Sequence, residues 1–317
     1  MKILITGITG LLGSYIAREF VGKAEIYGFK RPGSSLRLLE GIEAEIHWYE
    51  GNVSDVEEVE EAVEGKDLVI HAAGMVSFDS RDEDLLYKVN NVGTANLVNA
   101  MLNAGTKKLV YISSVSAIGR SSELAKIDET HKWAESPFNT VYATSKYFGE
   151  LEAWRGEQEG LDLIVVNPSI LLGKVTDDRS STEIYHYVLD ENSYYPEGDL
   201  NYLDVRDAAN LISLLVEKES WGERFILNKA SISYQDFFKE MAKVFGKRAP
   251  SKVATPVLIR LAVFYNGILR RFRLSKNPLN MQTAMITQQK MFYDNHKILG
   301  LLDFEFTSLE DTFNWAK

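Results

Sequence analysis

Residues 1–15, MKILITGITGLLGSY, decide the fold. A strand-like run from Ile3 to Ile5 leads directly into three glycines spaced three apart, and a helix-forming stretch follows from Ser14 to Phe20. The glycines are Gly7, Gly10 and Gly13. A glycine-rich turn between a strand and a helix lets the backbone approach a pyrophosphate, whose charge then lies at the positive end of the helix. The stretch therefore predicts a phosphate-binding loop; the alternative is that the glycines only let the strand pack tightly on the helix.

Strand-like runs alternate with helical patterns through the first half of the chain. The strand runs are KILIT (2–6), EIYGF (25–29), EIHWYE (45–50), LVIHAA (68–73), LVYISS (109–114) and DLIVVN (162–167), and the clearest helical patterns cover 55–63, 84–104 and 142–159. This alternation indicates an α/β fold with a doubly wound parallel sheet, whose ligand lies at the carboxyl ends of the strands. We predict a dinucleotide-binding Rossmann domain over 1–168. A smaller, mostly helical substrate lobe covers 169–317, with one or two segments of about 203–230 returning to the first domain.

The bulk composition narrows the class of protein. The chain has 317 residues, a formal net charge of −10 and no cysteine. The negative charge argues against nucleic acid as a partner, and the lack of cysteine excludes disulfides and fits a reducing compartment. The five histidines show no metal-ligand spacing, so no metal is implied. A strand, not a signal peptide, begins at Lys2, and we expect a cytoplasmic protein that acts on a small molecule.

The longest apolar stretch is VATPVLIRLAVFYNGILRRF, residues 253–272. Pro256, Arg260 and Asn266 interrupt it, and it falls short of the roughly 20 apolar residues that cross a bilayer. We interpret it as a partly buried helix and expect no membrane partner. Association with a membrane surface is the alternative.

The end of the second strand is where a dinucleotide fold recognises the adenosine ribose. An acid there would bind the 2′-hydroxyl of NAD, but the sequence is FKRPGSS (29–35), with no acid. It offers two cations and two hydroxyls: Lys30, Arg31, Ser34 and Ser35. These suit a 2′-phosphate and favour NADP(H) over NAD(H). The alternative is that Lys30 and Arg31 are only solvent-exposed residues at the end of the strand.

A tyrosine and a lysine in VYATSKYFGE lie four residues apart, on one face of a helix. A tyrosine with an ordinary pKa near 10 acts near neutral pH only if a neighbouring cation favours the tyrosinate, at about 1.4 kcal/mol per pKa unit. Lys146 can supply that cation to Tyr142. A second such pair, Tyr293 and Lys297, lies beyond the expected sheet and is interpreted as coincidental.

Hydroxyl groups follow the strand LVYISS, at the edge where a substrate carbonyl would lie. They belong to Ser113, Ser114 and Ser116. Ser114 is the first choice for the substrate-binding hydroxyl and Ser116 the second.

The ordered series of motifs resembles that of the extended short-chain dehydrogenases/reductases. The matching motifs are TGITGLLG (6–13), HAAG (71–74), NNVGT (90–94), YISSVS (111–116), the Tyr142/Lys146 pair, NPSILLG (167–173) and YLDVRDAAN (202–210). They span positions 1 to about 210. The Asn-Pro pair at 167–168 and the run HAAGMVSF are most similar to the branch that contains dihydroflavonol 4-reductases and 3β-hydroxysteroid dehydrogenases. Asn52 and Asn167 depart from the family, which often has an acid and an arginine at these positions.

The resemblance implies a role for each matched residue. Ser114 would bind the substrate oxygen, Tyr142 would transfer the proton, and Lys146 would hold the nicotinamide ribose and tune Tyr142. Asn90 would support this network, and Pro168 would lie beside the nicotinamide. The implied cofactor contacts are Gly7, Thr9, Gly10, Leu11, Leu12, Gly13, Lys30, Arg31, Ser35, Asn52, Val53, Ala72, Ala73, Gly74, Asn90, Tyr142, Lys146 and Pro168.

The same resemblance helps to choose the reaction. Sugar-nucleotide 4,6-dehydratases of this family need an Asp and a Glu where this chain has Val115 and Ser116. We therefore predict an NADP(H)-dependent carbonyl reductase, or the reverse alcohol dehydrogenase. The first alternative is an NAD-dependent sugar-nucleotide epimerase, and the second is a non-catalytic dinucleotide-binding scaffold.

The segment from Val175 to Leu203 bears on the substrate. Its only cation is Arg179, so a diphosphate-sugar would find little to pair with. It also contains Tyr185, Tyr187, Tyr194, Tyr195 and Tyr202. These suit an apolar or ring-containing substrate, unless they only pack the lobe. The helical patterns 84–104 and 142–159 could form a homodimer face, although burial against the sheet explains them equally well.

Overall fold

The computed structural model describes residues 1–120, 126–177, 182–271 and 280–317, with side chains omitted for 269–271. Arg179, which the sequence analysis singled out, lies outside the described residues. The largest element is a seven-stranded sheet in the order β11-β7-β5-β4-β1-β2-β3, and every pairing in it is parallel. Its strands are β1 (Lys2–Thr6), β2 (Glu25–Lys30), β3 (Ile46–Glu50), β4 (Leu68–His71), β5 (Lys108–Ile112), β7 (Asp162–Pro168) and β11 (Glu223–Leu227).

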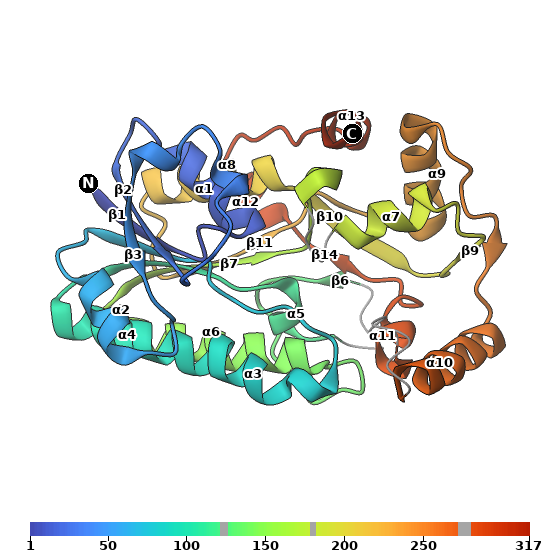
Figure 1. Ribbon diagram of the computed structural model, residues 1–317, viewed down its shortest axis with the longest axis horizontal. Helices are drawn as coiled ribbons and strands as arrows, with labels where there is room; N and C mark the ends of the chain where they lie inside the picture. Colours follow the sequence, from blue (N-terminus) through green and yellow to red (C-terminus); the bar gives the residue numbers. More distant parts are fainter. Residues whose placement is uncertain (121–125, 178–181, 272–279) are drawn as a thin grey trace.

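Helices cover both faces of this sheet (Figure 1). On one face lie α1 (Leu11–Phe20), α8 (Val205–Glu217) and α12 (His296–Leu301); on the other lie α2 (Val56–Val63), α3 (Glu83–Tyr87), α4 (Gly93–Ala104) and α6 (Val141–Gln158). Each layer has its own apolar core, because strands buried on both faces carry β-branched and leucine side chains on both sides. The predicted doubly wound parallel sheet is confirmed. Its strand order reverses at β1, between β2 and β4, which is where such folds bind ligands.

A second lobe is built on a three-stranded sheet in the order β12-β10-β8. Its strands are β8 (Ile170–Leu172), β10 (Asp199–Asp204) and β12 (Ala230–Ser233), and its helices are α7 (Glu183–Leu189), α9 (Tyr234–Phe245) and α13 (Leu309–Ala316). Two strand pairs join distant segments: β6 (Lys126–Ile127) with β14 (Phe292–Tyr293), and β9 (Tyr194–Tyr195) with β13 (Lys252–Val253). The remaining helices are α5 (Val115–Ile118), α10 (Pro256–Arg271) and α11 (Met281–Ile286), and short 3-10 turns cover Arg37–Leu39, Glu43–Glu45, Ser80–Asp82 and Val175–Asp177.

The tyrosines of the substrate lobe mostly pack its core. Tyr185 is fully buried and Tyr202 is 4% exposed. Tyr187 stacks on Phe238 with ring centroids 5.3 Å apart. Tyr195 also packs against this core, so of the two alternatives that the sequence left open for these residues, packing accounts for four of the five.

The expected helix over 84–104 is interrupted. A π-helical turn, η4 (Lys88–Val92), separates α3 from α4. Such turns contain one residue more than a regular helical turn and are frequent at functional sites. Here the turn brings the buried Asn90 toward the loop that follows β4.

The helix expected in the apolar stretch 253–272 is present as α10, and it is partly buried, but most of its apolar side chains are on the exposed side. Val257, Leu261 and Phe264 are 66%, 60% and 70% exposed, whereas Asn266 is 7% exposed. The apolar side of this helix thus faces away from the protein. Within the described residues, none of the helices is both long and apolar enough to cross a membrane.

Gly149 sets the closest approach between α6 and the π turn. A Cβ atom there would lie 2.2 Å from the carbonyl oxygen of Asn90 and 2.5 Å from the hydroxyl of Tyr111. We expect Gly149→Ala to lower the free energy of unfolding by about 1–3 kcal/mol, because the crowded backbone has to shift. Gly300→Ala in α12 is the matched control, since its Cβ would meet no atom within 4 Å. Urea unfolding measures both, and equal stability of the two variants would contradict this account of the α6 packing.

Candidate active site

The glycine loop after β1 is closed against the turn after β4. Gly7 has a φ of +67°, which favours glycine, and a Cβ atom there would lie 2.5 Å from the backbone nitrogen of Ala73. A Cβ atom on Gly13 would lie 2.3 Å from the Gly7 carbonyl oxygen. Gly10 caps α1 without a side-chain hydrogen bond. The close contacts of this loop therefore require glycine. The first N–H groups of α1 follow the loop and are available to a bound pyrophosphate.

The other residues predicted to contact the cofactor in this loop differ in their burial. Thr9 and Leu11 are partly buried, whereas Leu12 packs in the core between α1 and the sheet. The backbone N–H of Leu12 is therefore the group it could offer to a phosphate.

The cations at the end of β2 are in different environments. Lys30 forms an ion pair with Glu50 at the end of β3, and its ammonium lies 5.7 Å from the centroid of the Trp48 ring. The β2–β3 register places Lys30 directly beside Glu50. Arg31, the next residue, is exposed. Of the two predicted 2′-phosphate ligands, Lys30 already has a carboxylate partner.

Neighbouring residues complete this end of the site. Ser35 accepts a hydrogen bond from the backbone of Arg37, at 3.3 Å, and the Arg37 guanidinium donates to the carbonyl oxygen of Asp177, at 2.9 Å. Sequence reasoning missed Arg37, although it lies six residues after Arg31. The Asn52 side chain accepts from the Ser54 backbone, at 3.0 Å, and thus forms a local turn.

Val53 lies between this turn and α4. It is buried, and a Cβ atom on Gly93 would lie 2.7 Å from its side chain. Gly93 therefore lets α4 approach the end of β3.

Asn90 holds the loop after HAAG. Its side-chain oxygen accepts from the Met75 N–H at 2.8 Å, and its side-chain nitrogen donates to the Met75 carbonyl and to the Ser145 hydroxyl, both at 2.9 Å. A Cβ atom on Gly74 would lie 3.3 Å from the Asn90 oxygen and 3.9 Å from the Lys146 nitrogen. The absence of a side chain on Gly74 thus leaves room beside Lys146.

A buried histidine, which sequence reasoning did not assign, links β1 to this network. The Thr94 hydroxyl donates to the Asn90 carbonyl oxygen at 2.7 Å, so it accepts from His71 Nε2 at 3.3 Å. His71 Nδ1 therefore accepts from the Thr6 hydroxyl at 2.7 Å, and Thr6 in turn accepts from the Ala73 N–H at 3.2 Å. Burial lowers the pKa of His71 to about 3, with the Lys146 charge acting in the same direction. His71 is therefore neutral and serves as a structural link.

Ser114, Tyr142 and Lys146 meet at the carboxyl end of β5. Ser114 caps α5, with its hydroxyl accepting from the Ser116 N–H at 3.1 Å, and it lies beside Tyr142, whose pKa it lowers. Lys146 donates to the carbonyl oxygen of Ile112 at 2.7 Å. The Ser116 backbone thus supports Ser114, which is the hydroxyl beside Tyr142.

The electrostatics of this group differ from the sequence expectation. Burial raises the pKa of Tyr142, opposed by the Ser114 side chain and by the positive charge of Arg120. Arg120 is thus a cation that lowers the Tyr142 pKa and that sequence reasoning missed, while the tuning of Tyr142 by Lys146 stays a prediction. Burial also lowers the pKa of Lys146 to about 8, against the opposing effect of the Glu150 carboxylate.

Glu150 is the main residue that sequence reasoning missed. It is 1% exposed, accepts from Ser113 at 2.5 Å and from the Asn167 amide at 2.8 Å, and pairs with Arg224. The same Asn167 amide donates to the carbonyl oxygen of Ser114 at 2.9 Å. Asn167 therefore holds Ser114, and Pro168 follows it as the buried last residue of β7. The available signal was an acid four residues after Lys146, on the same helix face.

The substrate side of Tyr142 is framed by the carboxyl-terminal segment. Phe78 packs edge-on against the Tyr142 ring, with centroids 5.7 Å apart. Asn280 at the start of α11 donates to the Phe78 carbonyl at 3.0 Å, and Gln282 donates to the Asn139 carbonyl at 2.8 Å. The first turn of α11 is thus hydrogen-bonded to two loops that flank Tyr142.

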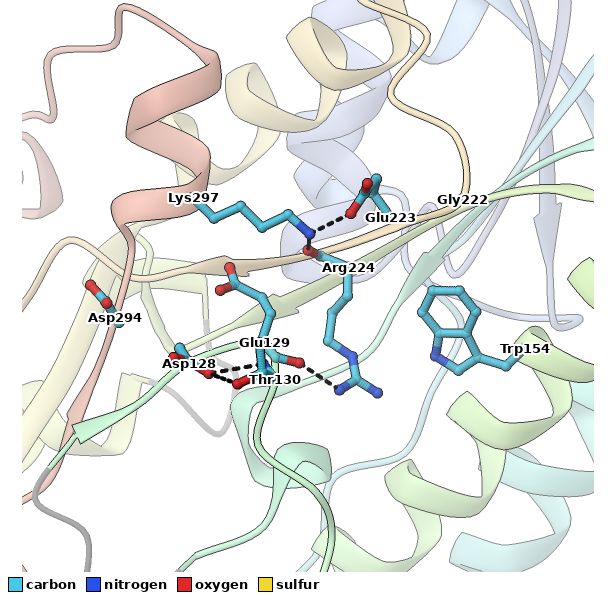
Figure 2. A pocket seen from close by; sticks show the side chains of 9 residues that line it. All are labelled: Asp128, Glu129, Thr130, Trp154, Gly222, Glu223, Arg224, Asp294 and Lys297. Atoms are coloured by element: carbon cyan, nitrogen blue, oxygen red, sulfur yellow. Dashed lines mark hydrogen bonds and ion pairs between the residues drawn. The ribbon is translucent and has the colours of Figure 1, made fainter.

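A cavity of about 660 Å³ lies elsewhere in the molecule, and Figure 2 shows the side chains that line it. It lies beside the first residues of β11, where Lys297 pairs with Glu223 and Arg224 donates to the Glu129 carbonyl. This is the amino end of an edge strand, opposite to the end where a doubly wound sheet binds its ligand. The second Tyr-x-x-x-Lys pair belongs to this region, because its lysine lines the cavity.

The link between Glu150 and Lys146 can be tested by titration. A carboxylate favours a nearby ammonium, so Glu150→Gln should move the pKa of Lys146 further below about 8. Lys146 would then lose its proton at a lower pH than in the unmodified protein. NMR of ¹⁵N-labelled lysine measures this, with Lys146→Arg identifying the signal. Glu152→Gln, on the same helix and paired with Arg155, is the matched control. If the Lys146 pKa were the same in both variants, Glu150 would have no electrostatic effect on Lys146.

Comparison with known proteins agrees with this geometry. The sequence profile of the NAD dependent epimerase/dehydratase family matches residues 3–227. The chain is 27% identical to a Synechocystis sp. protein provisionally named a dihydroflavonol 4-reductase, over 98% of this chain and 93% of that protein. It is 26% identical to cinnamoyl-CoA reductase 1 of Petunia hybrida, over 91% of this chain and 92% of that protein.

Solved structures give the same fold. The crystal structure of gox2253 matches with a TM-score of 0.84 and 27% identity, over 99% of this chain and 96% of that one. UDP-glucose 4-epimerase from Thermotoga maritima matches with a TM-score of 0.78, at 18% identity, over 100% of this chain and 97% of that one. The predicted resemblance is thus confirmed: the chain belongs to the NAD-dependent epimerase/dehydratase family, and with it to the NAD(P)-dependent extended short-chain dehydrogenases/reductases.

Proposed function

We propose that the protein is an NADP(H)-dependent carbonyl reductase that can also oxidise the corresponding alcohol. The observation that carries this proposal is that Ser114, Tyr142 and Lys146 lie together at the carboxyl edge of the sheet, where Ser114 lowers the pKa of Tyr142 and Lys146 donates to the Ile112 carbonyl oxygen. Relatives along most of the chain are named as reductases, which supports reduction over epimerisation.

The proposed chemistry needs one proton donor and one oxygen-binding hydroxyl. When bound, the reduced nicotinamide supplies a hydride to the carbonyl carbon. Tyr142 donates its proton to the carbonyl oxygen while Ser114 holds that oxygen by a hydrogen bond. The raised pKa of Tyr142 suits this direction, because the phenol keeps its proton at neutral pH until the oxygen becomes basic. The tyrosinate left behind is reprotonated from solvent, and Lys146 binds the ribose.

The preference for NADP(H) rests on the end of β2. The chain has no acid there to bind the 2′-hydroxyl of NAD. Arg31 is exposed at this position, and Arg37 and Ser35 lie close along the chain. We assign the 2′-phosphate to Arg31, because Lys30 is paired with Glu50.

Tyr142→Phe tests the proton donor. It should lower turnover of a carbonyl substrate by about 10²–10⁴-fold, the usual contribution of general acid catalysis, while the affinity for NADPH stays within a few fold. Tyr293→Phe, from the second Tyr-x-x-x-Lys pair, is the control and should keep its turnover. Carbonyl compounds can be screened by NADPH absorbance. Full turnover in Tyr142→Phe would remove Tyr142 from this role.

A fluorescence titration of nucleotide-free protein tests the cofactor. NADPH should bind about tenfold more tightly than NADH, a difference of roughly 1.4 kcal/mol. Arg31→Ala should abolish this preference, whereas Lys30→Ala should change it less because Glu50 already neutralises Lys30. NAD that survives purification, or a preference for NADH, would instead favour the sugar-nucleotide epimerase.

A further inference from the structure

The exposed side of α10 is apolar. Val257, Leu261, Phe264, Tyr265 and Ile268 are between 41% and 70% exposed. Their spacing is i, i+4, i+7, i+8 and i+11, which places them on one face of the helix. The opposite face contains the buried Asn266. Helices of globular proteins normally bury such a stripe. An exposed apolar stripe is typical of a surface that binds a partner outside the chain. Figure 1 shows α10 at the edge of the molecule, beside α11.

The charge of the surrounding segment is also unusual. Residues 241–293 contain ten of the 35 Lys and Arg residues of the chain and none of its 45 Asp and Glu residues, although the protein has a net charge of −10. Those exposed in the structure include Lys247, Arg248, Lys252, Arg260 and Lys290. Along the chain, the apolar stripe is flanked only by cations; the Glu191 carboxylate beside Arg248 and the Asp199 carboxylate near Lys290 come from other segments. An apolar stripe flanked by cations complements a surface that is apolar inside and anionic outside.

A second copy of the chain fits this surface less well. A symmetric dimer through α10 would bring the same cationic segment close to itself, because a two-fold interface joins identical patches. Other exposed apolar side chains, Leu85, Tyr87, Phe148 and Leu151 on α3 and α6, offer a homodimer a separate face.

We propose that α10 lies in the plane of an anionic lipid bilayer, with its apolar stripe among the acyl chains and the neighbouring lysines and arginines at the headgroups. The helix attaches the protein to one side of the bilayer and does not cross it. This is the membrane-surface alternative that the sequence left open for residues 253–272, and the exposure of the apolar stripe supports it.

Attachment through α10 would also place the candidate active site near the bilayer. α11, which packs against α10, is bonded through Asn280 and Gln282 to the loops beside Tyr142. Attachment through α10 therefore holds the substrate side of the site close to the bilayer, where carbonyl compounds that partition into lipid are concentrated. This consequence rests on the proposed reductase function, whereas attachment itself does not.

Vesicle binding tests the attachment without any nucleotide or substrate. The full-length protein should co-sediment with vesicles containing phosphatidylglycerol and much less with pure phosphatidylcholine vesicles, and added salt should weaken the binding. Val257→Glu should reduce the partition coefficient about tenfold or more, which corresponds to roughly 1.4 kcal/mol. Val56→Glu is the matched control, because Val56 is 50% exposed in the first turn of another helix. Absence of binding, or an equal loss in both variants, would overturn the proposal.

The lack of cysteine allows a second measurement. A polarity-sensitive dye on Val257→Cys should shift to shorter wavelength on addition of the anionic vesicles, while the same dye on Val56→Cys should not. A shift of the Val257→Cys dye that follows protein concentration without vesicles would show that a second copy covers the helix, and would overturn the proposal. If vesicles bind but Tyr142→Phe keeps full turnover, the reductase assignment fails while the attachment stands.

Discussion

The buried carboxylate of Glu150 is the interaction on which the active site depends. An unpaired charge in the interior costs several kcal/mol, so the native fold has to bring every partner of Glu150 into place at once. Those partners lie at the carboxyl end of β5, at the end of β7 and on the edge strand β11, and Glu150 itself is on α6. The carboxylate therefore fixes α6 relative to three strands, and with it the positions of Tyr142 and Lys146 relative to Ser114.

Most of the fold could be predicted because its signals are local. Strand periodicity and the glycine loop are visible within short windows, and the parallel sheet follows from their alternation. The electrostatics could not be predicted in the same way. Glu150 resembles an ordinary solvent-exposed acid until residues 113, 167 and 224 are brought beside it. Likewise, Lys30 and Glu50 lie 20 residues apart, and only the β2–β3 register shows that they pair.

The helix α10 illustrates a different limit. Its period and its amphipathic character are encoded in the sequence, but these properties do not say whether the apolar side has a partner within the chain. That depends on how the segment after α9 and the first turn of α11 are anchored. Asn280 and Gln282 tie α11 to the loops beside Tyr142, and the apolar side of α10 remains outside the core.

The π turn at Lys88–Val92 places Asn90 in the candidate site at the expense of regular helical hydrogen bonding. Deleting one residue there would restore a regular helix from Glu83 to Ala104, with better hydrogen-bond geometry, but would rotate Asn90 by about 100° about the helix axis. Its amide would then leave Met75 and Ser145. Selection for heat resistance alone would favour that deletion, while selection for turnover would oppose it. The irregular turn is thus the point at which homologues that have lost activity are expected to become shorter by one residue.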